Sequence, residues 1–201
     1  ARGYELGERW ALLDDGIDVK KYPCCYYTHA AIHAAIELAR EGGVTADAVD
    51  EVTVTASRGA AGALHYDDPT NGLEAKFSME YLVARAIARQ DVGLSAFDDD
   101  SVDDPDVQRV RERVEFAVDD DLPYDSNAAR VEVTTRAGER YERFRERPPG
   151  THDDPLSVEA LCDKFRMCAE RAPGPVALEP TLEALNDLRS VSDVGTVLEH
   201  C

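Results

Sequence analysis

The sequence predicts an α+β fold over residues 20–147, followed by an all-helical segment over residues 148–201. In the first region, short stretches of alternating apolar and polar residues, typical of strands, occur among longer stretches with helical spacing. After Pro148, proline- and glycine-rich turns separate helical patterns only. A chain of 201 residues, 43% of them hydrophobic, can bury a substantial core. We therefore expect a sheet packed against helices, and then a helical tail.

The first helix is expected at residues 28–42. Three apolar residues recur on one of its faces: Ile32, Ile36 and Ala39. Thr28 is a suitable N-cap, because its hydroxyl can accept a hydrogen bond from the first turn, and Gly42 is a stop signal. Residues 20–25 are expected to approach this helix as a strand or extended segment. Residues 1–19 are expected to be the end of a preceding segment without its own core.

Four segments have a pattern expected of strands: residues 50–57, 114–118, 130–135 and 140–145. In the first of them, Val52, Val54 and Ala56 fall on one face. The last two are separated by a turn around Ala137 and Gly138, which predicts a hairpin. Together the four segments predict a mixed or antiparallel sheet.

The remaining segments are expected to be helices and loops. Residues 77–90 form the most apolar helical pattern, apolar on more than one face, which is typical of a buried helix. Residues 58–73 are expected to be a long loop, and residues 98–106 an acidic loop. A short helix is expected to start at Pro105, since proline is tolerated in a first turn. A helix over residues 157–171 and one or two further helices complete the tail.

Acidic residues dominate the composition. The 41 aspartates and glutamates outnumber the 22 lysines and arginines, so the formal net charge is −19, and only four residues are lysines. Because an acidic surface keeps a protein dissolved in concentrated salt, we expect a halophilic source. The negative field disfavours nucleic acids and anionic membranes as partners.

Cysteine usage and the absence of long apolar runs predict the compartment. Five cysteines, an odd number, do not suggest a disulfide framework, which favours a reducing environment. No apolar run approaches the roughly 20 residues that cross a bilayer, and no signal-peptide pattern opens the chain. We therefore expect a cytoplasmic protein.

Residues 20–29, KKYPCCYYTH, lead into the first expected helix and bring together two lysines, a turn proline, two thiols and a histidine. Helix N-termini and lysines both favour negative charge, so this segment is a candidate anion site. Lys20 and His29 are expected to face the same place. The pattern does not identify the anion.

These ten residues resemble the lysine–Tyr-Pro–cysteine–Thr-His motif of the 2-methylcitrate dehydratase (MmgE/PrpD) family. Three further segments are similar to the family in order and spacing: residues 74–81 (EAKFSMEY), residues 92–97 (VGLSAF) and residues 155–166 (PLSVEALCDKFR). The resemblance covers nearly the whole chain.

The resemblance implies a specific architecture. Family members have a large all-helical domain and a smaller α+β lid, with the active site in the cleft between them. Residues 20–147 then correspond to the lid, and residues 148–201 to a tail that returns to the helical domain. We expect association with an N-terminal helical half, which in the family carries acidic and histidine residues implicated in catalysis. The sequence leaves open whether that half belongs to the same polypeptide, to a second one, or has been lost.

The resemblance also implies a chemistry. The family includes 2-methylcitrate dehydratase, an enzyme of propionate metabolism, cis-aconitate decarboxylase and iminodisuccinate epimerase. It implies a homodimeric lyase that removes water from a small di- or tricarboxylate after proton abstraction, without metal or organic cofactor. The alternatives are an epimerase (isomerase) or decarboxylase of the same family, or a non-catalytic module for binding or oligomerisation. Each of these reactions needs cations for carboxylates and a base that works near neutral pH.

Four residues are the candidates for this chemistry. Lys20 is expected to bind a substrate carboxylate; the alternative is a surface lysine. Lys76 is expected to bind substrate as well, because it lies just before the buried helix and could reach the cleft; it could instead contact a domain partner. His29 is expected to orient substrate or exchange a proton, or else only to cap the helix. Cys25 takes the position where some relatives have a cleft-facing histidine, which argues against decarboxylation unless the thiol has a lowered pKa.

A metal site is a weaker alternative. Cys25, His29 and His33 are spaced four residues apart, and histidines at that spacing can bind zinc on a helix. Cys25, however, precedes the helix, and no fourth ligand is nearby. Cys162 and Cys168 are six positions apart, so they are expected to be two separate, half-buried thiols.

Overall fold

A computed structural model describes residues 10–14 and 16–199. Most of the expected preceding segment, residues 1–9 and 15, lies outside the described residues; within it, one short helix, α1 (Ala11–Asp14), is described. The chain divides into two compact units between Pro155 and Leu156. Each unit is described by itself.

The first unit is built on a four-stranded sheet. Its strands are β1 (Val49–Ala56), β2 (Val114–Val118), β3 (Ala129–Thr135) and β4 (Arg140–Arg145). The spatial order is β2-β1-β3-β4; β2 runs parallel to β1, and the other two pairs are antiparallel. The β3–β4 hairpin turns at Gly138, which has a positive φ of 82°. The predicted α+β fold with a mixed sheet is confirmed.

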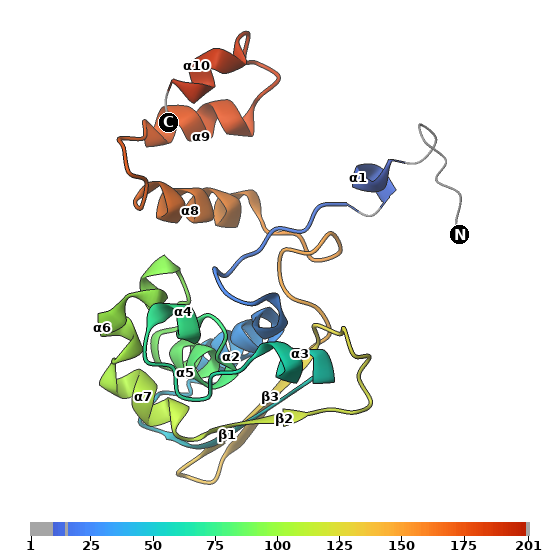
Figure 1. Ribbon diagram of the computed structural model, residues 1–201, viewed down its shortest axis with the longest axis vertical. Helices are drawn as coiled ribbons and strands as arrows, with labels where there is room; N and C mark the ends of the chain where they lie inside the picture. Colours follow the sequence, from blue (N-terminus) through green and yellow to red (C-terminus); the bar gives the residue numbers. More distant parts are fainter. Residues whose placement is uncertain (1–9, 15, 200–201) are drawn as a thin grey trace. The chain divides into compact units, whose positions relative to one another are not determined.

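Helices pack on one face of this sheet (Figure 1). The two long ones are α2 (His29–Glu41) and α5 (Met79–Arg89), which contact each other and the strands, and α7 (Pro105–Arg111) packs on α5. Val52, Val54 and Ala56 of β1 point into this interface and are at most 1% exposed, as their alternation predicts. Burial of apolar surface between the two layers is the main force that holds the unit together.

Both long helices follow their predicted patterns. All three residues of the apolar face of α2 are buried: Ile32, Ile36 and Ala39. Helix α5 starts after Ser78, whose hydroxyl accepts from the backbone N–H of Tyr81 at 3.1 Å, and it is buried on nearly all sides. Pro105 occupies the first turn of α7, as expected.

Two segments predicted as loops contain short helices instead. The predicted loop at residues 58–73 includes α3 (Arg58–Ala63) and the start of α4 (Gly72–Ala75), and the acidic segment includes α6 (Asp99–Val102). A 3₁₀ turn, Leu94–Phe97, precedes α6. The side chains of Ser57 and Asn71 cap α3 and α4 by accepting from backbone N–H groups. These N-caps satisfy otherwise unpaired donors, which explains why the chain turns into helices there.

Two predictions about the start of α2 are wrong. Residues 20–25 form no strand; they belong to a bent segment before the helix, residues 16–25, which we call the approach segment. Thr28 does not cap α2 with its hydroxyl, because a 3₁₀ turn (Tyr26–Thr28) already leads into the helix. The Thr28 hydroxyl instead donates to the backbone oxygen of Cys25 at 2.7 Å.

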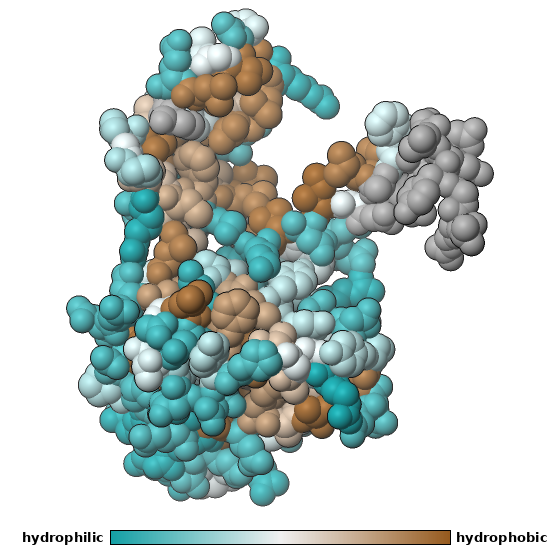
Figure 2. Space-filling view, in the orientation of Figure 1, coloured by the Kyte–Doolittle hydropathy of each residue, from teal (hydrophilic) through white to brown (hydrophobic). Residues whose placement is uncertain are grey.

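The second unit consists of three helices: α8 (Val158–Ala169), α9 (Leu178–Asn186) and α10 (Val194–Leu198). Ser157 caps α8 by accepting from the N–H of Ala160 at 3.1 Å. The tail, expected from residue 148, is helical from Val158, and residues 148–155 belong to the first unit instead. Helix α8 has no buried residue. Figure 2 shows apolar side chains at the surface of this unit. Within the described residues, no helix is long and apolar enough to cross a membrane.

Candidate functional site

A pocket of roughly 410 Å3 lies where the approach segment meets the turn before α5. Its lining residues are Lys20, Pro23, Cys24, Cys25, Tyr26, Lys76 and Phe77. The fold therefore brings together three residues that the sequence singled out, Lys20, Cys25 and Lys76, although Lys76 is distant from the other two in sequence. The fourth, His29, does not line this pocket.

Backbone contacts hold the two parts of the pocket together. The N–H of Cys25 donates to the backbone oxygen of Lys76 at 3.0 Å, which joins the approach segment to the turn before α5. The ammonium of Lys20 donates to the backbone oxygen of Cys24 at 3.3 Å. The ammonium of Lys76 lies 5.4 Å from the ring centroid of Phe97, within the range of a cation–π interaction. Both amines are thus placed by contacts of their own.

The pocket has a positive lining on a negative protein. Two of the four lysines of the chain form part of its wall, and none of its described lining residues is an aspartate or glutamate. Aliphatic and aromatic surface from Pro23, Tyr26 and Phe77 completes the wall. Such a lining suits a small molecule with a carbon skeleton and more than one carboxylate, because each ammonium can donate to a carboxylate oxygen.

His29 lies behind the pocket wall. It is fully buried, its ring centroid is 4.9 Å from that of Tyr26 and 5.2 Å from that of Tyr22, and the Tyr22 ring meets it edge to face. Because Tyr26 lines the pocket, the imidazole supports the wall from inside the first unit. His29 therefore contacts a residue that lines the pocket, but it is not itself a lining residue.

The two adjacent thiols have different environments. Cys24 is buried, contacts the Thr28 hydroxyl at 3.3 Å, and burial raises its pKa to about 12, so it is an unreactive thiol near neutral pH. Cys25 is a free, half-exposed cysteine in the pocket wall. Both cysteines line the pocket, and Cys25 is the more exposed of the two.

Sequence reasoning missed three aromatic residues of the site: Tyr26, Phe77 and Phe97. Tyr26 and Phe77 line the pocket, and Phe97 contacts the ammonium of Lys76. Phe77 had a detectable signal, since it directly precedes the N-cap Ser78 and therefore lies outside the buried helix. The contact between Phe97 and Lys76 depends on how the 3₁₀ turn folds back onto α4, which no local pattern shows.

The described residues contain no group of three or more histidine, cysteine, aspartate or glutamate side chains that could hold a metal ion. The three candidates for zinc ligands do not converge. Cys25 lines the pocket, His29 is in the core, and Nδ1 of His33 lies 2.7 Å from the hydroxyl of Tyr22.

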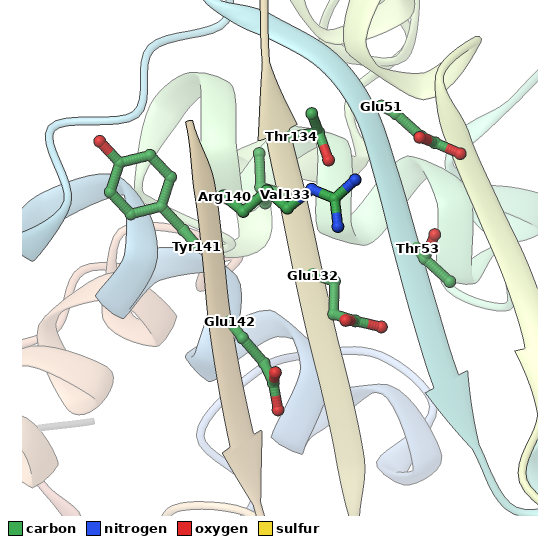
Figure 3. A pocket seen from close by; sticks show the side chains of 8 residues that line it. All are labelled: Glu51, Thr53, Glu132, Val133, Thr134, Arg140, Tyr141 and Glu142. Atoms are coloured by element: carbon green, nitrogen blue, oxygen red, sulfur yellow. The ribbon is translucent and has the colours of Figure 1, made fainter. Parts of the chain in front are cut away.

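A second hollow, of roughly 430 Å3, lies on the sheet face away from the helices (Figure 3). Its lining residues are Glu51, Thr53, Glu132, Val133, Thr134, Arg140, Tyr141 and Glu142. Figure 3 shows polar side chains from β1, β3 and β4 around it. With three glutamates and one arginine, this lining disfavours a carboxylate, and none of the residues singled out in the sequence contributes to it.

Comparison with known protein families identifies the family of the chain. Residues 22–186 match the MmgE/PrpD C-terminal domain. None of the curated proteins matches the chain. The matched range includes all four strands, the Cys25 and Lys76 sides of the pocket, and the tail as far as the end of α9. Because the match covers most of the 201 residues, the chain belongs to the MmgE/PrpD family, as its C-terminal domain.

Proposed function

We propose that this chain includes the lid of a lyase, which closes over the bound substrate. The lyase removes water from a small di- or tricarboxylate, as 2-methylcitrate dehydratase does. The observation that carries the proposal is the pocket that Lys20 and Lys76 both line, with no aspartate or glutamate among its described lining residues. On a chain of net charge −19, such a place is where a multiply anionic molecule can bind.

The two lysines have the main part in this proposal. Removal of a proton from the carbon beside a carboxylate builds negative charge on that carboxylate, and an ammonium already in contact stabilises it. The C–H electron pair becomes the new double bond and its proton passes to the base. The neighbouring hydroxyl takes up a proton from an acid of the helical half, its C–O bond breaks, and it leaves as water. Lys20 and Lys76 bind and stabilise the substrate carboxylates throughout.

Cys25 and His29 have secondary parts. Cys25 contacts the substrate from the pocket wall, where it is a free thiol. His29 assists indirectly, by holding the ring of Tyr26 in the wall. The base that abstracts the proton comes from the helical half of the enzyme, which faces the same pocket from the other side. The reaction needs no metal or organic cofactor.

The helical half is also the proposed partner of the tail. Apolar side chains of the second unit are exposed in the structure, among them Val158 at 64%, Leu188 at 52% and Leu198 at 71%. A surface of this kind is normally covered by another protein surface. The same observation supports the second candidate function, a non-catalytic module that oligomerises through its tail. In the enzyme, two copies of the complete assembly form a homodimer in the cytoplasm, where the four described cysteines remain free thiols.

Direct binding and turnover measurements test the proposal. Tricarballylate, a tricarboxylate that cannot lose water, is titrated into the chain by calorimetry. We expect Lys20→Gln and Lys76→Gln each to weaken binding by about tenfold or more, since each removes a charge-assisted hydrogen bond. Lys164→Gln, in α8, is the matched control and is expected to bind as tightly as the unchanged chain.

Turnover separates the two candidate functions. The chain is mixed with 2-methylcitrate or cis-aconitate, alone and together with a helical half of a family member, and the absorbance of the unsaturated acid is followed. Activity that appears with the helical half supports the enzyme. Absence of tricarballylate binding in every variant, with no turnover in either mixture, would leave only the oligomerisation module.

A further inference from the structure

A chain of polar side chains crosses the first unit behind the pocket. It starts at Tyr22 of the approach segment, passes through His33 and Glu37 of α2, and reaches Arg145 of β4 and Asp154 of the segment that follows. Its members come from four separate parts of the chain. None of them lines the pocket.

The first link joins Tyr22 and His33. The Tyr22 oxygen lies 2.7 Å from Nδ1 of His33, and Tyr22 is only 4% exposed. Burial raises the pKa of Tyr22 well above its ordinary value, so the hydroxyl keeps its proton. The other ring nitrogen of His33, Nε2, lies 3.8 Å from the Glu37 carboxylate, which favours the imidazole proton on that side. Nδ1 therefore accepts, and the Tyr22 hydroxyl donates.

Glu37 connects this link to the hairpin. Its Oε1 accepts from the guanidinium of Arg145 at 2.8 Å, and its Oε2 lies 3.7 Å from Nε of Arg143. Arg145 uses its other terminal nitrogen to donate to Asp154 at 2.7 Å. The side chains of Arg145 and Glu37 are only 20% and 24% exposed, so solvent screens this ion pair only in part.

The same region joins the two ends of the first unit. The N–H of Val19 donates to the backbone oxygen of Gly150 at 2.7 Å, and the N–H of His152 donates to the Asp18 carboxylate at 2.8 Å. The approach segment therefore pairs with residues 148–154, which we call the return segment. The polar chain anchors both segments to α2, Tyr22 on one side and Asp154 on the other.

Tyr22 lies between the two pocket residues Lys20 and Cys25 in the sequence. Its side chain points into the core, whereas theirs are at the pocket, and the backbone bends over residues 21–24. A fixed Tyr22 side chain therefore sets the position of this bend. The bend in turn determines where the Lys20 ammonium and the Cys25 thiol project.

We infer that Tyr22 and His33 are positioning residues, which hold the bend of the approach segment so that Lys20 and Cys25 face the pocket. Glu37, Arg145 and Asp154 extend this support to the return segment. The benefit of this arrangement for substrate binding rests on the proposed function. The arrangement itself is testable without any substrate.

The test uses Cys25 as a probe of the bend. The full chain is alkylated with iodoacetamide, and the labelling rate of each cysteine is followed by peptide mass spectrometry. Tyr22→Phe keeps the ring and removes only the hydroxyl. We expect the labelling rate of Cys25 or of the buried Cys24 to rise by roughly fivefold. Without the hydroxyl, opening of the approach segment breaks one hydrogen bond fewer and therefore needs less free energy. Tyr141→Phe, which removes the hydroxyl of an exposed contact in β4, is the control and is expected to label as the unchanged chain does.

A pair of substitutions at His33 decides whether the hydrogen bond itself matters. His33→Asn places an amide oxygen near the position of Nδ1 and is expected to keep slow labelling, whereas His33→Leu fills the space without an acceptor and is expected to label fast. This pair also decides the matter if Tyr22→Phe does not fold. Native circular dichroism with unchanged labelling of both cysteines in Tyr22→Phe and His33→Leu would overturn the inference.

Substrate binding is scored separately in the same samples. Protection of Cys25 by tricarballylate reports on the proposed function, whereas labelling without ligand reports on the positioning. Fast labelling in the two variants without protection in any sample would support positioning and contradict carboxylate binding. Weaker protection of Cys25 in Tyr22→Phe and His33→Leu, together with normal protection in His33→Asn, would support both the positioning role and carboxylate binding.

Discussion

Two helices of nearly equal length show how different the two units are. Helix α5 has 11 residues, of which eight are buried, while α8 has 12 residues and none is buried. Both begin with a serine N-cap and both are amphipathic. In the first unit α2, α7 and the sheet cover α5. The difference shows that helical spacing of apolar residues predicts a helix. Whether its apolar face becomes buried depends on a second surface that packs against it.

The second unit has little core of its own. Its only buried residues, among those the structure describes, are Thr181, Leu182 and Val197. The first unit, in contrast, has a continuous core that joins α2, α5 and the sheet. We therefore expect the first unit to fold without help, and the tail to gain most of its stability from whatever covers it.

The largest expected effect comes from separating the units. A chain that ends at Pro155 is expected to keep a cooperative thermal transition, whereas a peptide of residues 156–201 is expected to be mostly unfolded, because a segment this short rarely has enough core. Circular dichroism during heating measures both. A cooperative transition in the isolated peptide would remove the contrast between the units.

Leucines in the two units provide the next comparison. Leu82→Ala in α5 is expected to lower the free energy of unfolding by about 2–5 kcal/mol, because Leu82 is fully buried and the substitution leaves a cavity. Leu185→Ala in α9, at a side chain 43% exposed, is expected to change it by less than about 0.5 kcal/mol. Urea denaturation measures both values. Equal losses would mean that the tail contributes to one shared core.

The last expected effect is a pH dependence of the first unit, and it is small within any single pH unit. Burial, with Lys21, Arg145 and Arg40 nearby, lowers the pKa of His33 from its ordinary 6.5 to about 3, although Glu37 and the Tyr22 hydroxyl also face the ring. Between these values the unfolded chain binds a proton that the folded chain does not. Stability should therefore fall as the pH drops from 6.5 toward 3, by at most about 1.4 kcal/mol per pH unit.

The variant His33→Asn tests this assignment. It has no group that titrates at this position, so its stability between pH 6.5 and pH 5 should fall less steeply than that of the unchanged chain. Urea midpoints at several pH values in that range give the two slopes. Identical slopes would show that carboxylates, and not His33, determine the acid sensitivity.

Local patterns predicted the elements well where burial and chain geometry agree. Three elements were predicted correctly: strand β1 from its alternation, the buried helix α5 from its apolar surface, and the start of α7 from its proline. The errors occurred where side chains make local hydrogen bonds that the pattern does not show. Ser57 and Asn71 turn a predicted loop into short helices, and a 3₁₀ turn takes the place of the expected cap at Thr28.

The candidate site was predictable only in part. The motif around Lys20 and Cys25 and the lysine before α5 were singled out from the sequence, and the structure places all three in one pocket. The position of His29 was not predictable, because a histidine at a helix start can face either solvent or core. The two tyrosines whose rings contact it decide that it faces the core.

By itself the sequence determined the order of the four strands and of the longer helices, the acidic composition with few lysines, and the family motif. Each of these depends on residues that are neighbours in the chain or on composition alone. Only the tertiary structure decided that β2 lies parallel to β1, that Lys76 lines the same pocket as Lys20, and that Tyr22 connects through His33, Glu37 and Arg145 to the return segment. These are contacts between distant parts of the chain, and they form only when the sheet and its helices bury their common apolar surface.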